Sequence, residues 1–485
     1  MRLRVLSRLH LRADVMGADH AAPRRHFIDG EEVVVVHDMR TGDLVRMPPR
    51  AWALVQAADG TRDLGGLMLA ASQSGELRRT SEIVSVLTDL QEAGMLTDGI
   101  DPFAREPGEA VCGPETPLDV LPFRLTCDGS GACCATYSTV RFTEAEAERA
   151  RVLVPEAQGG RGRVFLPLAG SGAQASVAAT AIDGACAFLA GDGACEIHKG
   201  HGLAAKPSGC AIYPATFVFD GERVRVSLGV ECGCVARSVG REEGVPLVAE
   251  GAVTRADLPE GAQIVAIPEV VEIATGLTAP REEVVRWSRA AMRLPVGGDA
   301  VAILWALAAA VEKGDLSEAG VNAALSVERP PSAEALAPWV EAVAARTAEK
   351  RDSADRWRSA RDRVRVGSQR LAEAAAHLRE PGALDRLLAA NSSEAAKHGV
   401  DAGLERFYVT ASLHGHALIG DVPLAHALRD RAVRILLARA LGERAAGAGD
   451  AETERVSRDR EEALPLVEAM MRAQGVKEYA RLVPQ

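Results

Sequence analysis

The 485-residue chain lacks any long hydrophobic run. The longest apolar stretch, residues 300–311, is bounded by Asp299 and Glu312 and is well short of the ~20 residues that a membrane-spanning helix needs. Arg4, Arg8 and Arg12 interrupt the first residues, so the apolar core of a secretory signal, about 7–15 residues, is missing there. We therefore expect a cytoplasmic protein with no membrane partner.

The chain also lacks a surplus of basic charge. It has 56 Lys and Arg residues against 67 Asp and Glu residues, which gives a net charge of −11. Proteins that bind nucleic acids normally show a basic face, so no nucleic-acid partner is expected. No P-loop and no G-x-G-x-x-G fingerprint stands at a strand–helix junction, so the sequence predicts no nucleotide-binding loop.

Cysteine is absent from residues 1–111 and 235–485, yet nine cysteines lie between these regions. Disulfides do not persist in a reducing cytosol, so clustered thiols indicate metal ligands or catalytic groups. Cys112 lies in a segment rich in Pro, Gly and Glu, and we predict that it is not a ligand. The predicted metal ligands are the other eight: Cys127, Cys133, Cys134, Cys186, Cys195, Cys210, Cys232 and Cys234.

The spacing of these cysteines bears on the kind of metal. Thiolate is a soft ligand that selects zinc, copper(I) or iron–sulfur clusters. A structural zinc site usually uses two C-x₂₋₄-C pairs, and no C-x-x-C pair is present. Adjacent and isolated cysteines suit a [4Fe–4S] cluster better, with zinc as the alternative. His198 and His201 are alternative candidate zinc ligands, but the sequence favours an ordinary polar role for both.

Periodicity and turn signals predict an α+β, multidomain protein. Residues 1–105 read as a strand hairpin followed by three helices and a short strand at Met95-Leu96; 106–118 read as a linker, 119–245 as an irregular cysteine-rich domain, and 246–485 as an all-helical bundle. Thr143 is a predicted N-cap, and Pro280 is predicted to open a helix. Strands are predicted at 33–36, 44–47 and 223–230, and helices in the last region at 280–292, 299–313, 332–380, 404–418, 423–441 and 462–473.

The N-terminal unit resembles a winged helix of the PqqD type. The phrases "TGDLVRMPPRAWALVQAADGTRDLGGL" and "VLTDLQEAGML" carry this resemblance. In that family the unit captures a peptide, which adds a strand to the hairpin edge. The resemblance implies a protein or peptide partner, with residues 33–36 offering the edge. The alternative is a plain winged-helix packing module.

The cysteine motifs resemble the YkgJ-type, CxxCxxCC zinc- or iron-chelating family. The chain has "CDGSGACC", "CAFL", "GACEIH", "KPSGCAIYP" and "CGC" in the family's order. It departs from the family at three places: Ser130 replaces the second cysteine of the first motif, Lys206 the usual arginine, and His198 the usual tyrosine. The resemblance implies a metal centre held by the eight cysteines.

One branch of this family, the flagellin lysine-N-methylases, has a helical domain after the cysteine cluster. Residues 403–441 are similar in placement to a late segment of those enzymes, although Arg406-Phe407 stands where they tend to have Asn-Tyr. This resemblance implies an iron–sulfur cluster and S-adenosylmethionine, used to methylate a lysine. Helices 299–313 and 404–418 are predicted to form the wall facing the cluster, because both are apolar and interrupted by few charges. The alternatives are a non-catalytic zinc- or iron-binding protein for structure, storage or sensing, and an adaptor that presents a peptide to a maturation enzyme.

Overall fold

A computed structural model describes 24 stretches or single positions of the chain and leaves gaps between them. The described residues are 8–9, 24–28, 31–38, 43–49, 52, 66, 69, 73, 96–97, 111–127, 131, 141–155, 165–167, 177–179, 186, 188–190, 192–259, 262–295, 297–327, 329–356, 362–389, 401–415, 422–447 and 462–473. Cys133 and Cys134 lie outside them, and only isolated positions of the three expected N-terminal helices lie inside. No helix in the described part has the length and apolar character needed to cross a membrane.

The chain forms two compact units of mixed α and β structure, which we describe separately. Unit 1 comprises Met1–Gly108, Cys134–Pro207 and Asp352–Arg365, and unit 2 comprises Glu109–Cys133, Ser208–Arg351 and Val366–Gln485. The boundaries fall inside the predicted cysteine-rich region, residues 119–245, so the cysteines are divided between the units. The three-part functional division stays a prediction.

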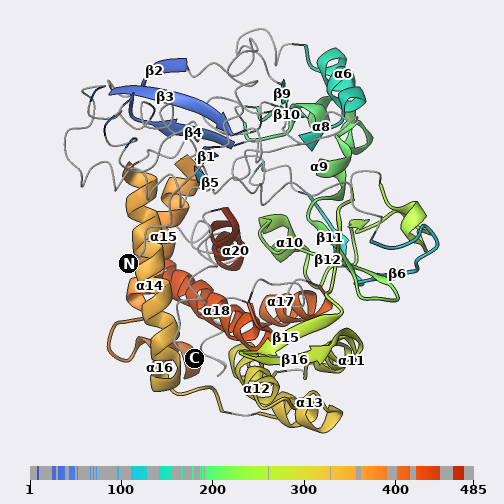
Figure 1. Ribbon diagram of the computed structural model, residues 1–485, viewed down its shortest axis with the longest axis vertical. Helices are drawn as coiled ribbons and strands as arrows, with labels where there is room; N and C mark the ends of the chain where they lie inside the picture. The colour runs from blue at the N-terminus through green and yellow to red at the C-terminus, as the bar shows by residue number, and fades with distance from the viewer. Residues whose placement is uncertain are drawn as a thin grey trace. The chain divides into compact units, whose positions relative to one another are not determined.

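The N-terminal sheet of unit 1 has three antiparallel strands in the order β2-β3-β4. They are β2 (Arg24–Ile28), β3 (Glu31–Asp38) and β4 (Asp43–Met47) (Figure 1). The strands predicted at 33–36 and 44–47 are confirmed, whereas β2 was missed. Because β3 is paired on both sides, the expectation that residues 33–36 offer an open edge is wrong. The predicted strand at Leu96 is confirmed as β5 (Leu96–Thr97), which pairs with β1 (Arg8–Leu9).

The second part of unit 1 packs helix α6 (Glu144–Leu153) against helix α8 (Glu196–His201). Thr143 is the N-cap of α6, as predicted, and forms a capping box with Glu146. The buried face of α6 joins an apolar cluster that includes Phe142, Phe188 and Ile197. A small sheet in the order β8-β10-β9 lies beside this core, with strands β8 (Arg141–Phe142), β9 (Phe165–Pro167) and β10 (Val177–Ala179).

Unit 2 is built on a four-stranded sheet in the order β14-β11-β12-β6. The central hairpin, β11 and β12, is antiparallel, and each outer strand runs parallel to its neighbour. The strand predicted at 223–230 is confirmed as β12, and all five of its residues are buried. The bounds are β14 (Ile264–Ala266), β11 (Ala215–Phe219), β12 (Val224–Leu228) and β6 (Leu118–Val120).

The helices of unit 2 pack against this sheet and against one another, and the apolar helix α12 lies on α18. Asp299 caps α12 by accepting a hydrogen bond from the backbone N–H of Ala302. The helix bounds are α11 (Arg281–Ala291), α12 (Ala300–Glu312), α13 (Glu318–Leu325), α14 (Ala333–Arg356), α15 (Asp362–His377), α16 (Ala383–Ala389), α17 (Ala402–His414), α18 (Leu424–Gly447) and α20 (Ala463–Ala473).

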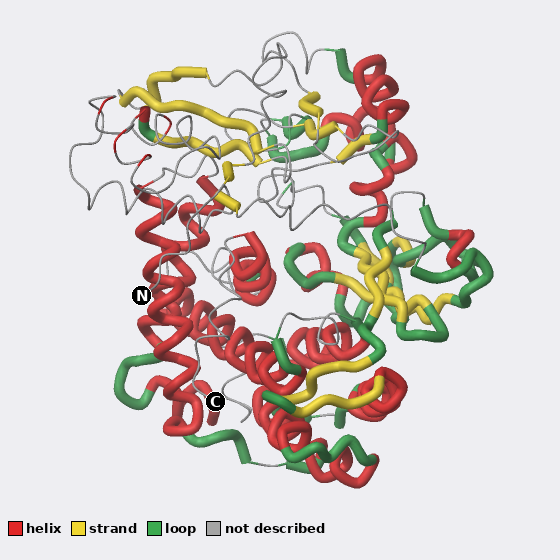
Figure 2. Tube along the Cα trace, viewed as in Figure 1, coloured by secondary structure: helices red, strands yellow, loops and turns green. Residues whose placement is uncertain are grey.

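The prediction that residues 246–485 are all helical is wrong. A hairpin of β15 (Val270–Ala274) and β16 (Leu277–Pro280) lies among the helices, as the yellow strands of Figure 2 show. In β15, Val271 and Ile273 are buried, whereas Val270 and Glu272 are exposed. This period of two is a strand signal. The helical composition of the surrounding sequence masked it.

The described half of the predicted linker, residues 111–118, is a fixed part of unit 2. The backbone N–H of Leu118 donates to the carbonyl of Val253 at 2.9 Å, and that of Arg255 donates to Thr116 at 2.8 Å. Cys112 in this segment is buried. Its thiol therefore belongs to the packing of unit 2.

Candidate metal centre

Two cysteine-bearing helices adjoin the same end of the β11–β12 hairpin. Helix α9 (Ser208–Ile212) carries Cys210 and precedes β11, whereas α10 (Gly233–Ser238) follows β12 and carries Cys234, with Cys232 at its N-cap. Ala215 is paired with Leu228, and just beyond this pair the N–H of Gly229 donates to the carbonyl of Pro214 at 2.9 Å. The antiparallel register therefore brings the "KPSGCAIYP" and "CGC" motifs together.

Cys127, the first residue of the first cysteine motif, is carried to the same end of the sheet by parallel pairing. Val120 of β6 is the register partner of Val226, so the chain runs on toward Cys127 in the direction in which β12 runs toward Cys232. Two hydrogen bonds complete the approach. The N–H of Thr126 donates to Ser238 Oγ at 3.0 Å, and Ser238 Oγ–H donates to the carbonyl of Cys234 at 2.7 Å.

The four thiols at this sheet end differ in exposure. Cys232 and Cys234 are 5% and 4% exposed, Cys210 is half-buried, and Cys127 is exposed. None of the four forms a disulfide, and the Cys232 side chain makes no capping hydrogen bond. Within the described residues, no three His, Cys, Asp or Glu side chains lie close enough together to hold a metal ion. The fold therefore places the four segments at one end of the sheet, but their described side chains do not form one coordination sphere in this structure.

Two further predicted ligands, Cys186 and Cys195, lie in unit 1 and are close to each other. The N–H of Leu189 donates to the carbonyl of Cys186 at 3.0 Å, and Leu189 forms a β-bridge with Cys195. Both cysteines contact the apolar cluster around Phe142 and Phe188. Buried thiols in apolar surroundings are usually inert. Their role as ligands stays a prediction.

The two candidate histidines on α8 have different surroundings. Burial and the nearby charge of Lys206 lower the pKa of His198, which keeps its imidazole neutral, the form that binds a metal. The Nε2 atom of His201 lies 2.9 Å from the carbonyl oxygen of Leu153, to which it donates. His201 therefore ties α8 to the end of α6. Of the two, His198 is the one whose ring the described contacts leave for a ligand role.

Helix α17 lies against the sheet that carries the cysteines. The rings of Phe123 and Phe407 have their centroids 4.8 Å apart, and Ser227 Oγ donates to the carbonyl of Ala411 at 2.8 Å. At its end, His414 Nε2 donates to the carbonyl of Asp119 at 2.9 Å. The helix predicted at 404–418 therefore borders the sheet. Helix α12, the other predicted wall, packs against α17, α18, α13 and β15.

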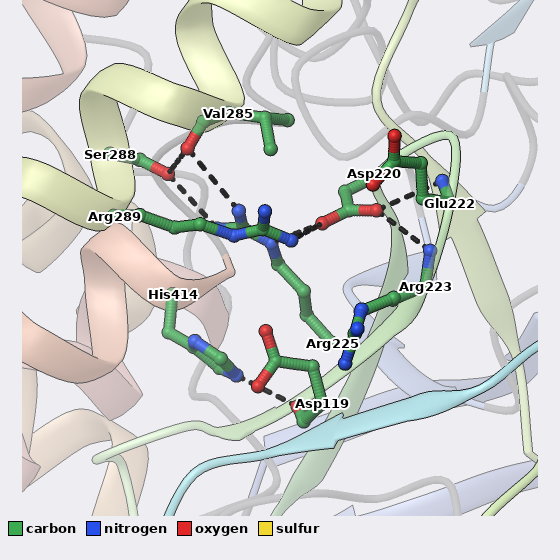
Figure 3. Close-up of polar contacts among 9 residues, drawn as sticks. All are labelled: Asp119, Asp220, Glu222, Arg223, Arg225, Val285, Ser288, Arg289 and His414. Atoms are coloured by element: carbon green, nitrogen blue, oxygen red, sulfur yellow. Dashed lines mark hydrogen bonds and ion pairs between the residues drawn. The ribbon is translucent and has the colours of Figure 1, made fainter.

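A buried ionic network clamps the other end of the hairpin to α11 (Figure 3). The Asp220 carboxylate accepts from Arg225 Nε at 2.8 Å and from Arg289 at 3.1 Å. Burial opposes its charge, but the Arg225 guanidinium and the N–H groups of Arg223 and Glu222 hold the pKa of Asp220 below its usual value. The sequence patterns did not predict this network. Its one signal was a charged residue, Arg225, inside an apolar strand.

No family model, curated protein or solved structure matches this chain. The resemblances to the YkgJ-type and PqqD-type families are therefore carried by the sequence motifs alone.

Proposed function

We propose that this chain is a metal-binding cysteine-cluster protein of the YkgJ type that holds an iron–sulfur cluster, with zinc as the alternative metal. The observation that carries the proposal is the topology of unit 2. Antiparallel pairing of β11 with β12 and parallel pairing of β12 with β6 bring the segments of Cys127, Cys210, Cys232 and Cys234 to one end of one sheet. Four thiolates are the usual ligand set of a [4Fe–4S] cluster or of a structural zinc ion.

The chemistry of these donors fits such a centre. All four are soft ligands outside any disulfide, and Cys232 and Cys234 are buried, which protects a cluster from solvent. Arg237 brings a positive charge within 3.7 Å of Cys234 Sγ and favours the thiolate that a metal requires. Cys133, Cys134, Cys186 and Cys195 are the remaining proposed ligands. The cysteines would hold the metal in place, and the bound metal would supply Lewis-acid or electron-transfer chemistry.

The deciding experiment is anaerobic purification followed by a visible spectrum and analysis for iron, sulfide and zinc. An iron–sulfur protein should be brown, with a broad absorption near ~400 nm that fades on reduction. A colourless protein with tightly bound zinc and no iron would select the zinc alternative. A chain that retains neither metal after anaerobic preparation and reconstitution would contradict the proposal.

A second candidate function is enzymatic: an S-adenosylmethionine-dependent, lysine-N-methylase-like modifier of a protein or peptide. The packing of α17 against the cysteine-bearing sheet favours it, because the Phe123–Phe407 contact provides apolar surface beside that sheet, which suits a methyl-transfer site. A lysine must attack as a neutral amine, and apolar surroundings lower its pKa. In this proposal, residues 1–105 are the winged-helix substrate clamp, 119–245 the metal region and 246–485 the helical wall.

The enzymatic candidate is tested by donor binding. Reconstituted protein should bind S-adenosylmethionine in calorimetry and should add methyl groups to lysine in a candidate partner, as seen by mass spectrometry. If fully metallated protein does not bind the donor, the storage, sensing, structural and adaptor roles remain. A peptide partner would then be sought at the outer edges of β2 and β4, since β3 is paired on both sides.

A further inference from the structure

Arg237 lies over the "CGC" turn of unit 2 and links it to the C-terminal helix α20. Its guanidinium lies 3.7 Å from Cys234 Sγ and 3.3 Å from the carboxylate of Glu462, which directly precedes α20. Both charged side chains are largely shielded, with 20% and 28% of their surface exposed. Charges in such a place are screened less by salt than charges on an open surface.

Gly233 provides a second, steric observation on the same arrangement. It is one helical turn before Arg237, and a Cβ at this position would lie 3.1 Å from one guanidinium nitrogen and 3.4 Å from the other. The glycine therefore leaves the space that the guanidinium fills beside Cys234. The absence of a side chain at Gly233, the middle residue of "CGC", therefore allows the Arg237 guanidinium to occupy its position.

We infer that Arg237 is a positioning residue for the metal centre. Glu462 holds its guanidinium, which neutralises the thiolate charge at Cys234 and thereby joins the centre to α20. The inference rests on the proposed function. A fixed guanidinium donating to a metal-bound thiolate offsets the negative charge of the ligand set and restricts the orientation of the sulfur. Loss of such outer partners typically lowers metal affinity by about 10–100-fold. For an iron–sulfur centre, loss of the positive charge also lowers the reduction potential.

The experiment uses full-length protein, freed of metal without oxygen, and cobalt(II) as a probe whose thiolate charge-transfer bands report sulfur ligation. The variants are Arg237→Gln, which removes the charge, Arg237→Lys, which keeps it without the planar fork, and Glu462→Gln, which removes the anchor. The matched control is Arg379→Gln, since Arg379 forms an exposed pair with Glu341 at 2.9 Å. We expect cobalt affinity to fall about 10–100-fold in Arg237→Gln, less in the other two, and not in the control.

Gly233→Ala keeps every charge and cysteine and suits the helix, so it tests the geometry if Arg237→Gln does not fold. Its methyl group would lie 3.1 Å from one guanidinium nitrogen, so the guanidinium must shift by a few tenths of an ångström, and cobalt affinity should change if the metal site depends on its position. Equal affinity of wild type, Arg237→Gln and Gly233→Ala, each within about twofold, would overturn the inference and leave the metal-binding proposal intact. Absence of cobalt–thiolate bands in the wild type would overturn both.

Discussion

Cys112 and Cys234 are both buried thiols in unit 2, which makes them a matched pair for testing the ligand assignment. They are 7% and 4% exposed, respectively. We expect Cys234→Ala to lose most of the bound metal, because it removes a thiolate at the sheet end where the motifs meet. Cys112→Ala should keep the wild-type metal content per chain, measured by elemental analysis. Loss of metal in Cys112→Ala would show that the ligand set is wrong.

Asp220 is the residue on which the clamp at the tip of the β11–β12 hairpin depends. Asp220→Asn should lower the free energy of unfolding by about 3 kcal/mol or more, because it leaves the Arg225 guanidinium buried without a counter-charge. Urea denaturation measures the change. The exposed pair of Arg293 and Glu318 provides the control, and Glu318→Gln should cost less than about 1 kcal/mol.

The lowered pKa of Asp220 also predicts how the stability of the protein changes in acid. Its pKa in the folded protein is lowered, so its contribution to stability is complete above the pKa of an unfolded aspartate, about 3.9. That contribution is lost as the pH falls through the lower, folded-state pKa. Asp220→Asn should therefore lose less stability than the wild type in this acid range. Parallel acid profiles would contradict this assignment.

At the scale of the element, His414 joins the end of α17 to β6 through a hydrogen bond to the Asp119 carbonyl, and its imidazole should be neutral at pH 7. Burial lowers the pKa of His414, although its hydrogen bond to the Asp119 carbonyl opposes the shift. The unfolded chain takes up this proton near about pH 6.5, and the folded chain only at lower pH. Stability should therefore fall as the pH drops below about 6.5, because the unfolded state binds more protons.

His414→Gln tests this link between elements. Glutamine has no titrating group, but its amide can still donate to the Asp119 carbonyl. The variant should lose part of the pH dependence of the urea midpoint between about pH 7 and pH 5. An unchanged slope would assign that dependence to other histidines.

The elements also show where local sequence signals are sufficient. The α6 helix begins after Thr143, which forms a capping box with Glu146 three residues on. Helix α12 begins after Asp299, whose side chain accepts from the N–H of Ala302. The β15–β16 hairpin was missed although its alternation was present, since Ala-rich, helix-forming sequence surrounds it. Strand β2 was missed because its formation depends on pairing with β3.

At the scale of the whole molecule, metal binding and folding of unit 2 should be linked. Binding to the folded chain stabilises it, so metal removal by a chelator should lower the melting temperature. We expect amide hydrogen exchange to rise most in α10 and α20, which are joined by the pair of Arg237 and Glu462. Helix α12, packed on α18, should stay protected. A uniform increase over α10, α12 and α20 would contradict a centre located at this end of the sheet.

The sequence by itself determined the mixed α and β character, most helices of unit 2, strand β12 and the identity of the soft donors. These features depend on caps, periodicity and residue chemistry within a few positions of one another. Only the tertiary structure decided which cysteine-bearing segments of unit 2 lie at the same end of the sheet. Residues 118–120 pair with residues 224–226 across about a hundred positions, and this parallel register carries Cys127 toward Cys232. No local sequence signal encodes this pairing. The free energy that stabilises it arises when β12 is buried by its neighbouring strands and by α17, which are distant in the sequence.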